Sequence, residues 1–413
     1  MSKRLPEALR MREFALLWTS SLANGLATQM LAVAIGWQVY AIHRNPLDLG
    51  LVGLAEFVPL PLLALPAGHL ADRASRRLVL AGGLVVQVAI AALLLLVTLA
   101  GAHTLWPFLA IAALAGVASG VTNPAGRSLT PEIVPPELLQ GALALRSVAS
   151  QIGIVAGPAL GGIVFAVDPV AVYATALGLF ALSVATILAL TPRAAPVDDS
   201  AAAPTWENLA AGLRFILRTR MLLGLILLDL FAVLLGDPIA LAPVFARTIL
   251  DVGPIGLGAL RAAPSVGALL AGVLIARRPL TLRAGPAMLA VVAIFGGATI
   301  VFGVSRWLPL SLGALFVTGF VDMVSVNIRQ TAATVITPLA LQGRVSAVEW
   351  VFISASNELG AFEAGAVASV LGTVRAVVLG GALMVAIASS WRRLFPELSR
   401  MGPLQELRVG SAA

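Results

Sequence analysis

Residues 78–100 read LVLAGGLVVQVAIAALLLLVTLA, a stretch with no charged side chain and a single amide, Gln87. A bilayer core about 30 Å thick is crossed by a helix of roughly 20 apolar residues. Arg76 and Arg77 stand directly before the stretch and Gly101 directly after it, so polar residues and a turn residue mark its ends. The stretch therefore predicts a membrane-spanning helix.

The rest of the chain repeats this pattern. Of its 413 residues, 59% are hydrophobic and 11% are charged, against roughly 25% charged in a typical soluble domain. Uninterrupted apolar runs favour helices over barrel strands, which alternate in pieces of about ten residues. We predict an all-α integral membrane protein with twelve transmembrane helices, at residues 14–41, 49–70, 78–100, 105–126, 142–166, 169–191, 221–246, 254–276, 284–304, 307–328, 345–371 and 374–391.

Basic residues are distributed unevenly among the predicted loops. With both termini cytoplasmic, 21 of the 27 Lys and Arg residues lie on the cytoplasmic side, four lie outside, and Arg146 and Arg261 lie within spans. This bias sets the orientation by the positive-inside rule and accounts for the net charge of +7 without a nucleic-acid partner. We predict a multi-pass protein of a bacterial cytoplasmic (inner) membrane whose first span is not a cleaved signal peptide.

The longest polar interruption, at residues 191–220, lies near the midpoint of the chain. Its second part places Trp206, Leu209, Leu213 and Ile216 on one helical face, which is typical of a helix lying in the membrane interface. We predict an N-terminal six-helix bundle at 1–191, a cytoplasmic linker with this helix at 192–220, a C-terminal six-helix bundle at 221–393 and a cytoplasmic tail at 394–413.

The two predicted bundles look duplicated. A constant shift of 204 residues aligns Gly68 with Gly272, Asn123 with Asn327 and Gly161 with Gly365. Two pseudo-symmetric six-helix repeats of the same orientation are the architecture of alternating-access carriers, whose substrate sites lie near the middle of the membrane.

The loop between the second and third spans reads Gly68-His-Leu-Ala-Asp72-Arg73-Ala-Ser-Arg76-Arg77. It resembles the signature loop of the major facilitator superfamily. The resemblance implies a charge network of Asp72, Arg73 and Arg76 that latches the cytoplasmic helix ends in the outward-facing state. The alternative is a basic membrane anchor with no switching role, which would not need Asp72.

Two further segments extend the resemblance over nearly the whole chain. Asn123-Pro-Ala-Gly-Arg127 and Gly157-Pro158-Ala-Leu-Gly161-Gly162 look like the superfamily branch that contains the enterobactin exporter and drug:proton antiporters. This implies efflux, with Arg127 in the charge network and a gating role for the glycine segment. Glycines leave one side of a helix bare for close packing, so a tight helix crossing without gating is the alternative for Gly157, Pro158 and Gly161.

Ionisable residues inside the bilayer are costly and mark functional positions. Nine fall within the predicted spans, namely Glu56, Arg146, Asp229, Asp237, Arg261, Asp322, Glu349, Glu358 and Glu363. Carboxylates outnumber arginines, and apolar surroundings favour the protonated form of a carboxyl group. The sequence therefore predicts proton coupling.

Depth in the membrane separates these acids. Asp229 and Asp322 lie in the seventh and tenth spans, which line the central cavity in the superfamily, so we predict that they bind protons or substrate. Asp237 is predicted to bind protons or substrate as well. With Glu358 it shares the depth of Arg261, as either a structural ion cluster or a switch.

Two residues of the first half complete the predicted site. Glu56 is predicted to bind a proton or substrate, with an uncharged hydrogen-bonding role as the alternative. Asn24 is the polar residue best placed to contact substrate, although such residues also bond neighbouring helices.

The sequence lacks the residues that several other kinds of chemistry require. The chain has no cysteine, its three histidines have no metal-ligand spacing, and its single lysine, Lys3, belongs to no phosphate-binding loop. We therefore predict no metal, no cofactor and no enzymatic activity.

The function that these features predict is export of a small amphipathic or cationic compound, of drug or siderophore type, by proton antiport through alternating access. Its expected partners are the small-molecule substrate, protons and membrane lipid, and we expect a monomer. The alternatives are a proton-coupled uptake symporter and, from another class, a membrane-embedded enzyme or scaffold.

Overall fold

The computed structural model describes residues 7–59, 75–101, 103–191, 206–278 and 283–406. These residues are almost entirely helical, and their one β feature is an isolated bridge between Arg283 and Pro403. They divide into two compact units. Unit 1 comprises the described parts of Met1–His43, Ala55–Ala203 and Gly253–Ala262, and unit 2 those of Arg44–Leu54, Pro204–Val252 and Ala263–Ala413.

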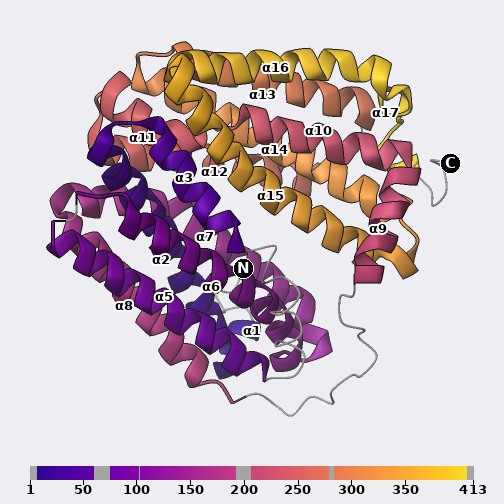
Figure 1. Ribbon diagram of the computed structural model, residues 1–413. Helices are drawn as coiled ribbons and strands as arrows, with labels where there is room; N and C mark the ends of the chain where they lie inside the picture. The colour runs from indigo at the N-terminus through magenta and orange to yellow at the C-terminus, as the bar shows by residue number, and fades with distance from the viewer. Residues whose placement is uncertain (1–6, 60–74, 102, 192–205, 279–282, 407–413) are drawn as a thin grey trace. The chain divides into compact units, whose positions relative to one another are not determined.

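Unit 1 is built mainly from long helices that pack side by side. They are α2 (Arg12–His43), α5 (Arg76–Leu99), α6 (Trp106–Ile133), α7 (Pro136–Val167) and α8 (Pro169–Leu188), with the short α1 (Glu7–Arg10) and the end of α3 (Pro46–Phe57). Helix α2 lies against α7 and α8, and α5 lies against α6 and α8 (Figure 1).

The helix ends of unit 1 follow from local sequence. Ser75 caps α5 by accepting a hydrogen bond from the Leu78 amide, and Asp168 caps α8 in the same way from the Val170 amide. Such caps satisfy amides that have no partner inside the helix. A cluster of apolar side chains that includes Phe14 and Leu129 fills the space between the helices.

Unit 2 contains α9 (Trp206–Arg218), α10 (Arg220–Gly236), α13 (Ala284–Val304), α14 (Leu308–Ile336), α15 (Leu339–Leu371), α16 (Thr373–Leu394) and most of α12 (Gly253–Arg277). Helix α10 is followed by η1 (Pro238–Leu241), α11 (Ala242–Val244) and the π-helical turn η2 (Phe245–Ile249). Helix α13 packs against α14 and α16, and α10 packs against α15 and α16.

The segment that follows α16 folds back within unit 2. Beyond α16, α17 (Pro396–Arg400) buries Leu398, and the amide of Gly285 donates to the Met401 carbonyl. An ion pair of 3.4 Å joins Arg220 to Glu397. The final turn, η3 (Leu404–Glu406), ends the described chain.

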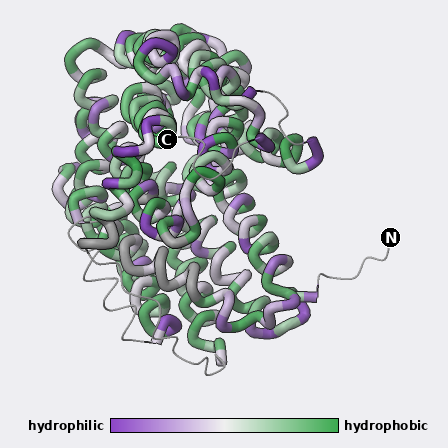
Figure 2. Tube along the Cα trace, turned by 90° about the vertical axis from the view of Figure 1, so that its right-hand side faces the viewer, coloured by the Kyte–Doolittle hydropathy of each residue, from purple (hydrophilic) through white to green (hydrophobic). Residues whose placement is uncertain are grey.

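The fold confirms an all-helical membrane protein. Nine helices of the described chain are long and apolar enough to span a bilayer, and apolar residues run along most of the trace (Figure 2). Large apolar side chains such as Leu78 and Leu96, each 61% exposed, lie on helix surfaces as lipid contact requires. The three remaining predicted spans correspond to α3, α6 and α15, so the count of twelve stays a prediction.

Candidate functional site

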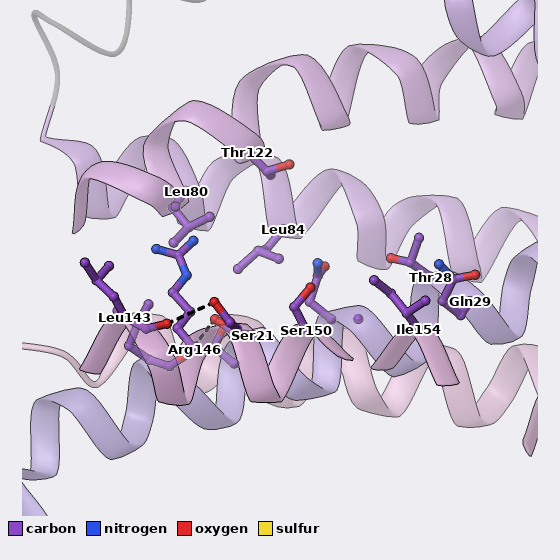
Figure 3. Close-up of a pocket in the computed structure, with 16 residues that line it drawn as sticks. Ser21, Thr28, Gln29, Leu80, Leu84, Thr122, Leu143, Arg146, Ser150 and Ile154 are labelled. Carbon is purple, nitrogen blue, oxygen red and sulfur yellow. Dashed lines mark hydrogen bonds between the residues drawn. The ribbon is translucent and has the colours of Figure 1, made fainter. Parts of the chain in front are cut away.

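A cavity of about 670 Å³ opens within unit 1 between α2, α5, α6 and α7. Hydroxyl and amide groups alternate with apolar groups along its wall, and Figure 3 shows Arg146 near one end and Gln29 near the other. We call it the unit 1 cavity and define it by its lining: Leu17, Ser20, Ser21, Asn24, Gly25, Thr28, Gln29, Leu80, Leu84, Thr122, Gly126, Leu143, Arg146, Ser147, Ser150 and Ile154.

Two of the lining residues have distinctive hydrogen bonding. Arg146 donates from Nη1 to the Thr130 hydroxyl at 2.8 Å, which holds its guanidinium between α6 and α7. Asn24, predicted from the sequence to contact substrate, has a buried Oδ1 atom that accepts no hydrogen bond within the described chain. A buried acceptor without a donor is costly, so this atom is suited to a ligand.

The glycine segment of α7 produces a very close helix crossing. A Cβ added at Gly153 would lie 3.0 Å from the backbone of Gly25 in α2, and one at Gly161 would lie 2.9 Å from the Cα atom of Met30. At Gly157 the nearest atom would be the Gln29 Cβ, at 2.5 Å. The tight crossing is therefore present, and a gating role for Gly157, Pro158 and Gly161 stays a prediction.

Two further glycine crossings have matching geometry. A Cβ at Gly162 would lie 2.5 Å from the Pro254 carbonyl oxygen and 3.1 Å from the Cα atom of Gly258, inside unit 1. A Cβ at Gly365 would lie 2.8 Å from the Pro46 carbonyl oxygen and 3.0 Å from the Cα atom of Gly50, inside unit 2. Each crossing pairs one glycine with a proline and a second glycine four residues later.

A group of charged residues lies inside unit 2, where α10, α14 and α15 meet. Asp229 of α10 forms an ion pair with Arg329 of α14, and their side chains are only 9% and 7% exposed. A small cavity of about 10 Å³ lies beside this pair, and Glu349 of α15 lines it too. One of the Glu349 carboxylate oxygens is buried without a hydrogen-bond partner in the described chain. Two carboxylates and one guanidinium therefore line one small cavity, and we call these three residues the buried charge triad.

The sequence placed Glu349 within a predicted span but did not pair it with Asp229, and it placed Arg329 beyond the end of the tenth span. In the structure α14 continues to Ile336 and α15 begins at Leu339, so Arg329 lies within a helix. The signal lay in the apolar residues after Arg329, because Ala332, Ala333 and Ile336 are all buried.

Asp322 and Asp237 differ in their surroundings. Asp322 of α14 is half-buried and, as far as the described residues show, forms no ion pair, although its charge interacts with that of Asp237. Asp237 ends α10, and its Oδ1 accepts from the Ile239 amide at 2.9 Å. Asp237 therefore has a local capping role in addition to the predicted one.

The remaining in-span candidates are distributed over both units. Arg261 donates to the Ala32 carbonyl at 2.7 Å in unit 1, and Glu358 of unit 2 lies beside Gly53, whose added Cβ would be 3.4 Å from its Oε2. Pairing of Arg261 with Asp237 or Glu358 stays a prediction. In unit 1, the Glu56 backbone packs closely on Gly116 of α6, and the predicted role of the Glu56 carboxyl stays a prediction.

The predicted latch falls partly outside the description. Asp72 and Arg73 lie outside the described residues, and the side chain of Arg127 in α6 is not described either. Arg76 forms an ion pair with Glu132 near the end of α6, an acid that the sequence did not single out. Arg77 donates to the Ile187 carbonyl at 3.1 Å. These contacts tie α5 to α6 and α8.

The described chain has two compact helical units with apolar surfaces, a polar cavity and a buried charge triad. These features are typical of multi-pass membrane carriers. The chain belongs to the MFS_3 family of the major facilitator superfamily, described as transmembrane secretion effector, whose family model matches residues 6–402. It is thus a transporter of a small-molecule substrate and not an enzyme.

Comparisons with individual proteins agree with this family assignment. The chain is 28% identical over 366 residues to a multidrug efflux pump, Tap, of Mycolicibacterium fortuitum, which covers 86% of this chain and 88% of that protein. It is 26% identical over 366 residues to an uncharacterized MFS-type transporter, YfiS, of Bacillus subtilis (strain 168), with 84% of each covered. A bacterial homologue of the human lysosomal transporter Spinster, solved inward-facing and unoccupied, has the same fold, with TM-score 0.76, 14% identity and 98% and 100% of the chains covered.

Proposed function

We propose that this transporter exports a small amphipathic or cationic compound, of drug or siderophore type, by proton antiport through alternating access. The observation that carries the proposal is the buried charge triad. Asp229 pairs with the Arg329 guanidinium, and the second carboxylate, that of Glu349, lines the same small cavity of unit 2. An uncompensated charge is costly there, so the triad favours one bound proton that can be released when its surroundings change.

The direction of transport is proposed from the relative. The multidrug efflux pump that is 28% identical to this chain exports drugs, as its name states, and the similarity covers 86% of this chain. Export against a gradient needs an energy source, and an inward proton gradient is one that in-span carboxylates can use. Proton-coupled uptake would use the same carboxylates but would move substrate in the opposite direction.

Energised everted vesicles test both parts of the proposal, with ethidium and fluorescein as probe dyes. Respiration acidifies the lumen of such vesicles, so an antiporter should concentrate a transported dye inside and a protonophore should abolish the accumulation. Glu349→Gln should remove the proton-driven part, because an amide cannot exchange a proton at this position. The matched control is Glu137→Gln, at an exposed position in the first turn of α7.

Two outcomes would contradict the proposal. Dye movement out of acidified vesicles would indicate symport. Dye accumulation that is unchanged by the protonophore would exclude proton coupling.

A further inference from the structure

Helix α9 directly precedes a membrane span of unit 2. A single residue, Thr219, separates its last residue, Arg218, from Arg220, where α10 begins a stretch long and apolar enough to cross a bilayer. The Thr219 amide donates to the Phe215 carbonyl at 3.0 Å, so the chain passes from one helix into the next without a loop. Figure 1 shows α9 beside the start of α15. Because the span begins at Arg220, we expect α9 to lie close to the level of the lipid headgroups.

The rotation of α9 about its own axis is fixed by its packing on α15. At Gly212 the two helices approach so closely that an added Cβ would lie 2.6 Å from the Arg344 carbonyl oxygen. Ile216, one turn further on, is 1% exposed and packs in a cluster with Val345 and Val348. The sequence placed Ile216 on the membrane-facing side of this helix, and the structure instead buries it within unit 2. The side of α9 that carries Gly212 and Ile216 is therefore closed to a partner.

The rest of α9 exposes apolar and basic side chains next to one another. Leu213 and Leu217 are one helical turn apart and are 37% and 54% exposed. Arg214 and Arg218 are also one turn apart, and both are exposed. At about 100° of rotation per residue, the two arginines lie roughly opposite Gly212 and the two leucines lie on the flank between. We call these two leucines and two arginines the exposed α9 face.

The chemistry of this face selects its partner. Arg214 donates from Nε to the Ala210 carbonyl at 3.2 Å, and its guanidinium has further N–H donors. Guanidinium groups bind phosphate oxygens in pairs of hydrogen bonds, and exposed leucines gain free energy when they leave water. Residues 206–220 contain three arginines and one acid, Glu207; the linker acids Asp198 and Asp199 lie outside the described residues. A partner that offers phosphate oxygens beside an apolar surface would match both parts of the face.

We infer that the exposed α9 face binds anionic phospholipid, with the headgroup phosphate at Arg214 and Arg218 and the upper part of the acyl chains against Leu213 and Leu217. Basic amphipathic helices at a membrane surface recognise acidic lipids through this combination of charge and apolar contact. The lipid lies on the surface of unit 2 and takes no part in the proposed proton exchange. The inference is therefore independent of the proposed function.

Nitroxide quenching in lipid nanodiscs tests the inference with the full-length protein. The chain has no cysteine, so Leu217→Cys carries a single NBD fluorophore on the exposed α9 face. The discs contain phosphatidylcholine with a small, equal fraction of nitroxide-labelled phosphatidylglycerol or nitroxide-labelled phosphatidylcholine, the nitroxide being near the carbonyl end of one acyl chain. Each arginine at an anionic membrane surface favours binding roughly fivefold. The quenching constant of the anionic lipid should therefore exceed that of the zwitterionic lipid by roughly fivefold or more.

Charge variants then locate the headgroup. Arg214→Gln together with Arg218→Gln should bring the two quenching constants to within about twofold, and raised salt should do the same because it screens exposed charges. Arg277→Gln with Arg278→Gln, at exposed positions at the end of α12, removes the same charge elsewhere and should leave the preference unchanged. A fluorophore attached at Leu96→Cys, on the exposed surface of α5, should be quenched equally by both lipids.

Three results would overturn the inference. Equal quenching by the two lipids in the labelled protein would show that the face does not select anionic lipid, as would be the case if Asp198 and Asp199 neutralised the arginines. Absence of quenching by either lipid would place the face in water, as docking of an acidic protein requires. A preference that persists in the folded Arg214→Gln, Arg218→Gln protein would assign lipid binding to other residues. If that protein does not fold, the comparison of the two lipids on the labelled protein decides alone.

Discussion

At the scale of single residues, Arg329 is the basic member of the buried charge triad in unit 2. Its guanidinium is buried beside Asp229 and close to Glu349. Removing one member of a buried ion pair leaves the other charged and poorly solvated, which is strongly destabilising. Arg329 therefore has a structural role in addition to any part in proton exchange.

Arg329→Gln should lower the stability of the purified protein by about 3–5 kcal/mol, because Asp229 loses its counter-ion. Thermal unfolding in detergent measures the loss. The double variant Asp229→Asn with Arg329→Gln should be more stable than Arg329→Gln alone, since neither charge is left unpaired. Equal stability of Arg329→Gln and wild type would contradict a buried pair.

At the scale of helices, glycine positions decide how closely the helices approach. Gly162 and Gly365 each fit a backbone of the sequence Pro-x-x-x-Gly, at Pro254–Gly258 and Pro46–Gly50. The matching glycines are Gly162 and Gly365, one residue away from the 204-residue shift that aligns Gly161 with Gly365, so the predicted repeat stays a prediction. A methyl group has no room at either crossing.

Gly162→Ala and Gly365→Ala should each destabilise the protein by about 1–3 kcal/mol, the usual cost of overpacking. The added Cβ would lie 2.5 Å and 2.8 Å from a carbonyl oxygen. Thermal unfolding again provides the measurement. Gly178→Ala in α8 is the control, because nothing lies within 4 Å of its added Cβ and alanine favours a helix. A neutral result at both crossing positions would contradict the close approach.

The sequence could predict most helices but few of the contacts between them. Long apolar runs identify spans because a helix that crosses the lipid core must be apolar. This criterion identified α5, α8 and α13 correctly. The span at α15 was less clear from the sequence, because Glu349, Glu358 and Glu363 interrupt its apolar residues. Nothing in the sequence pairs Arg329 with Asp229, which are 100 positions apart, because such contacts depend on tertiary packing.

At the scale of the whole molecule, each unit contains a segment from the other half of the sequence. Residues Arg44–Leu54 belong to unit 2, and Gly253–Ala262 belong to unit 1. The two units are thus not a simple division of the chain at its midpoint. In alternating access one repeat moves against the other around the site.

Asp72→Asn should shift the balance towards the inward-facing state, because the resemblance assigns Asp72 to a network that holds the outward-facing one. The chain contains no cysteine, so a single Ser150→Cys reporter in the unit 1 cavity can be labelled cleanly. A thiol reagent added from the predicted cytoplasmic side should react faster in the Asp72→Asn background. An unchanged rate would favour the membrane-anchor alternative.

The central claim is that carboxylates of this transporter exchange protons for substrate. Its most direct test follows lumenal pH with acridine orange in energised everted vesicles when ethidium or fluorescein is added. A transported dye should release lumenal protons with the wild-type protein, and this release should be lost in Asp229→Asn and Glu349→Gln proteins that still insert and fold. Undiminished proton release in both variants would contradict the central claim.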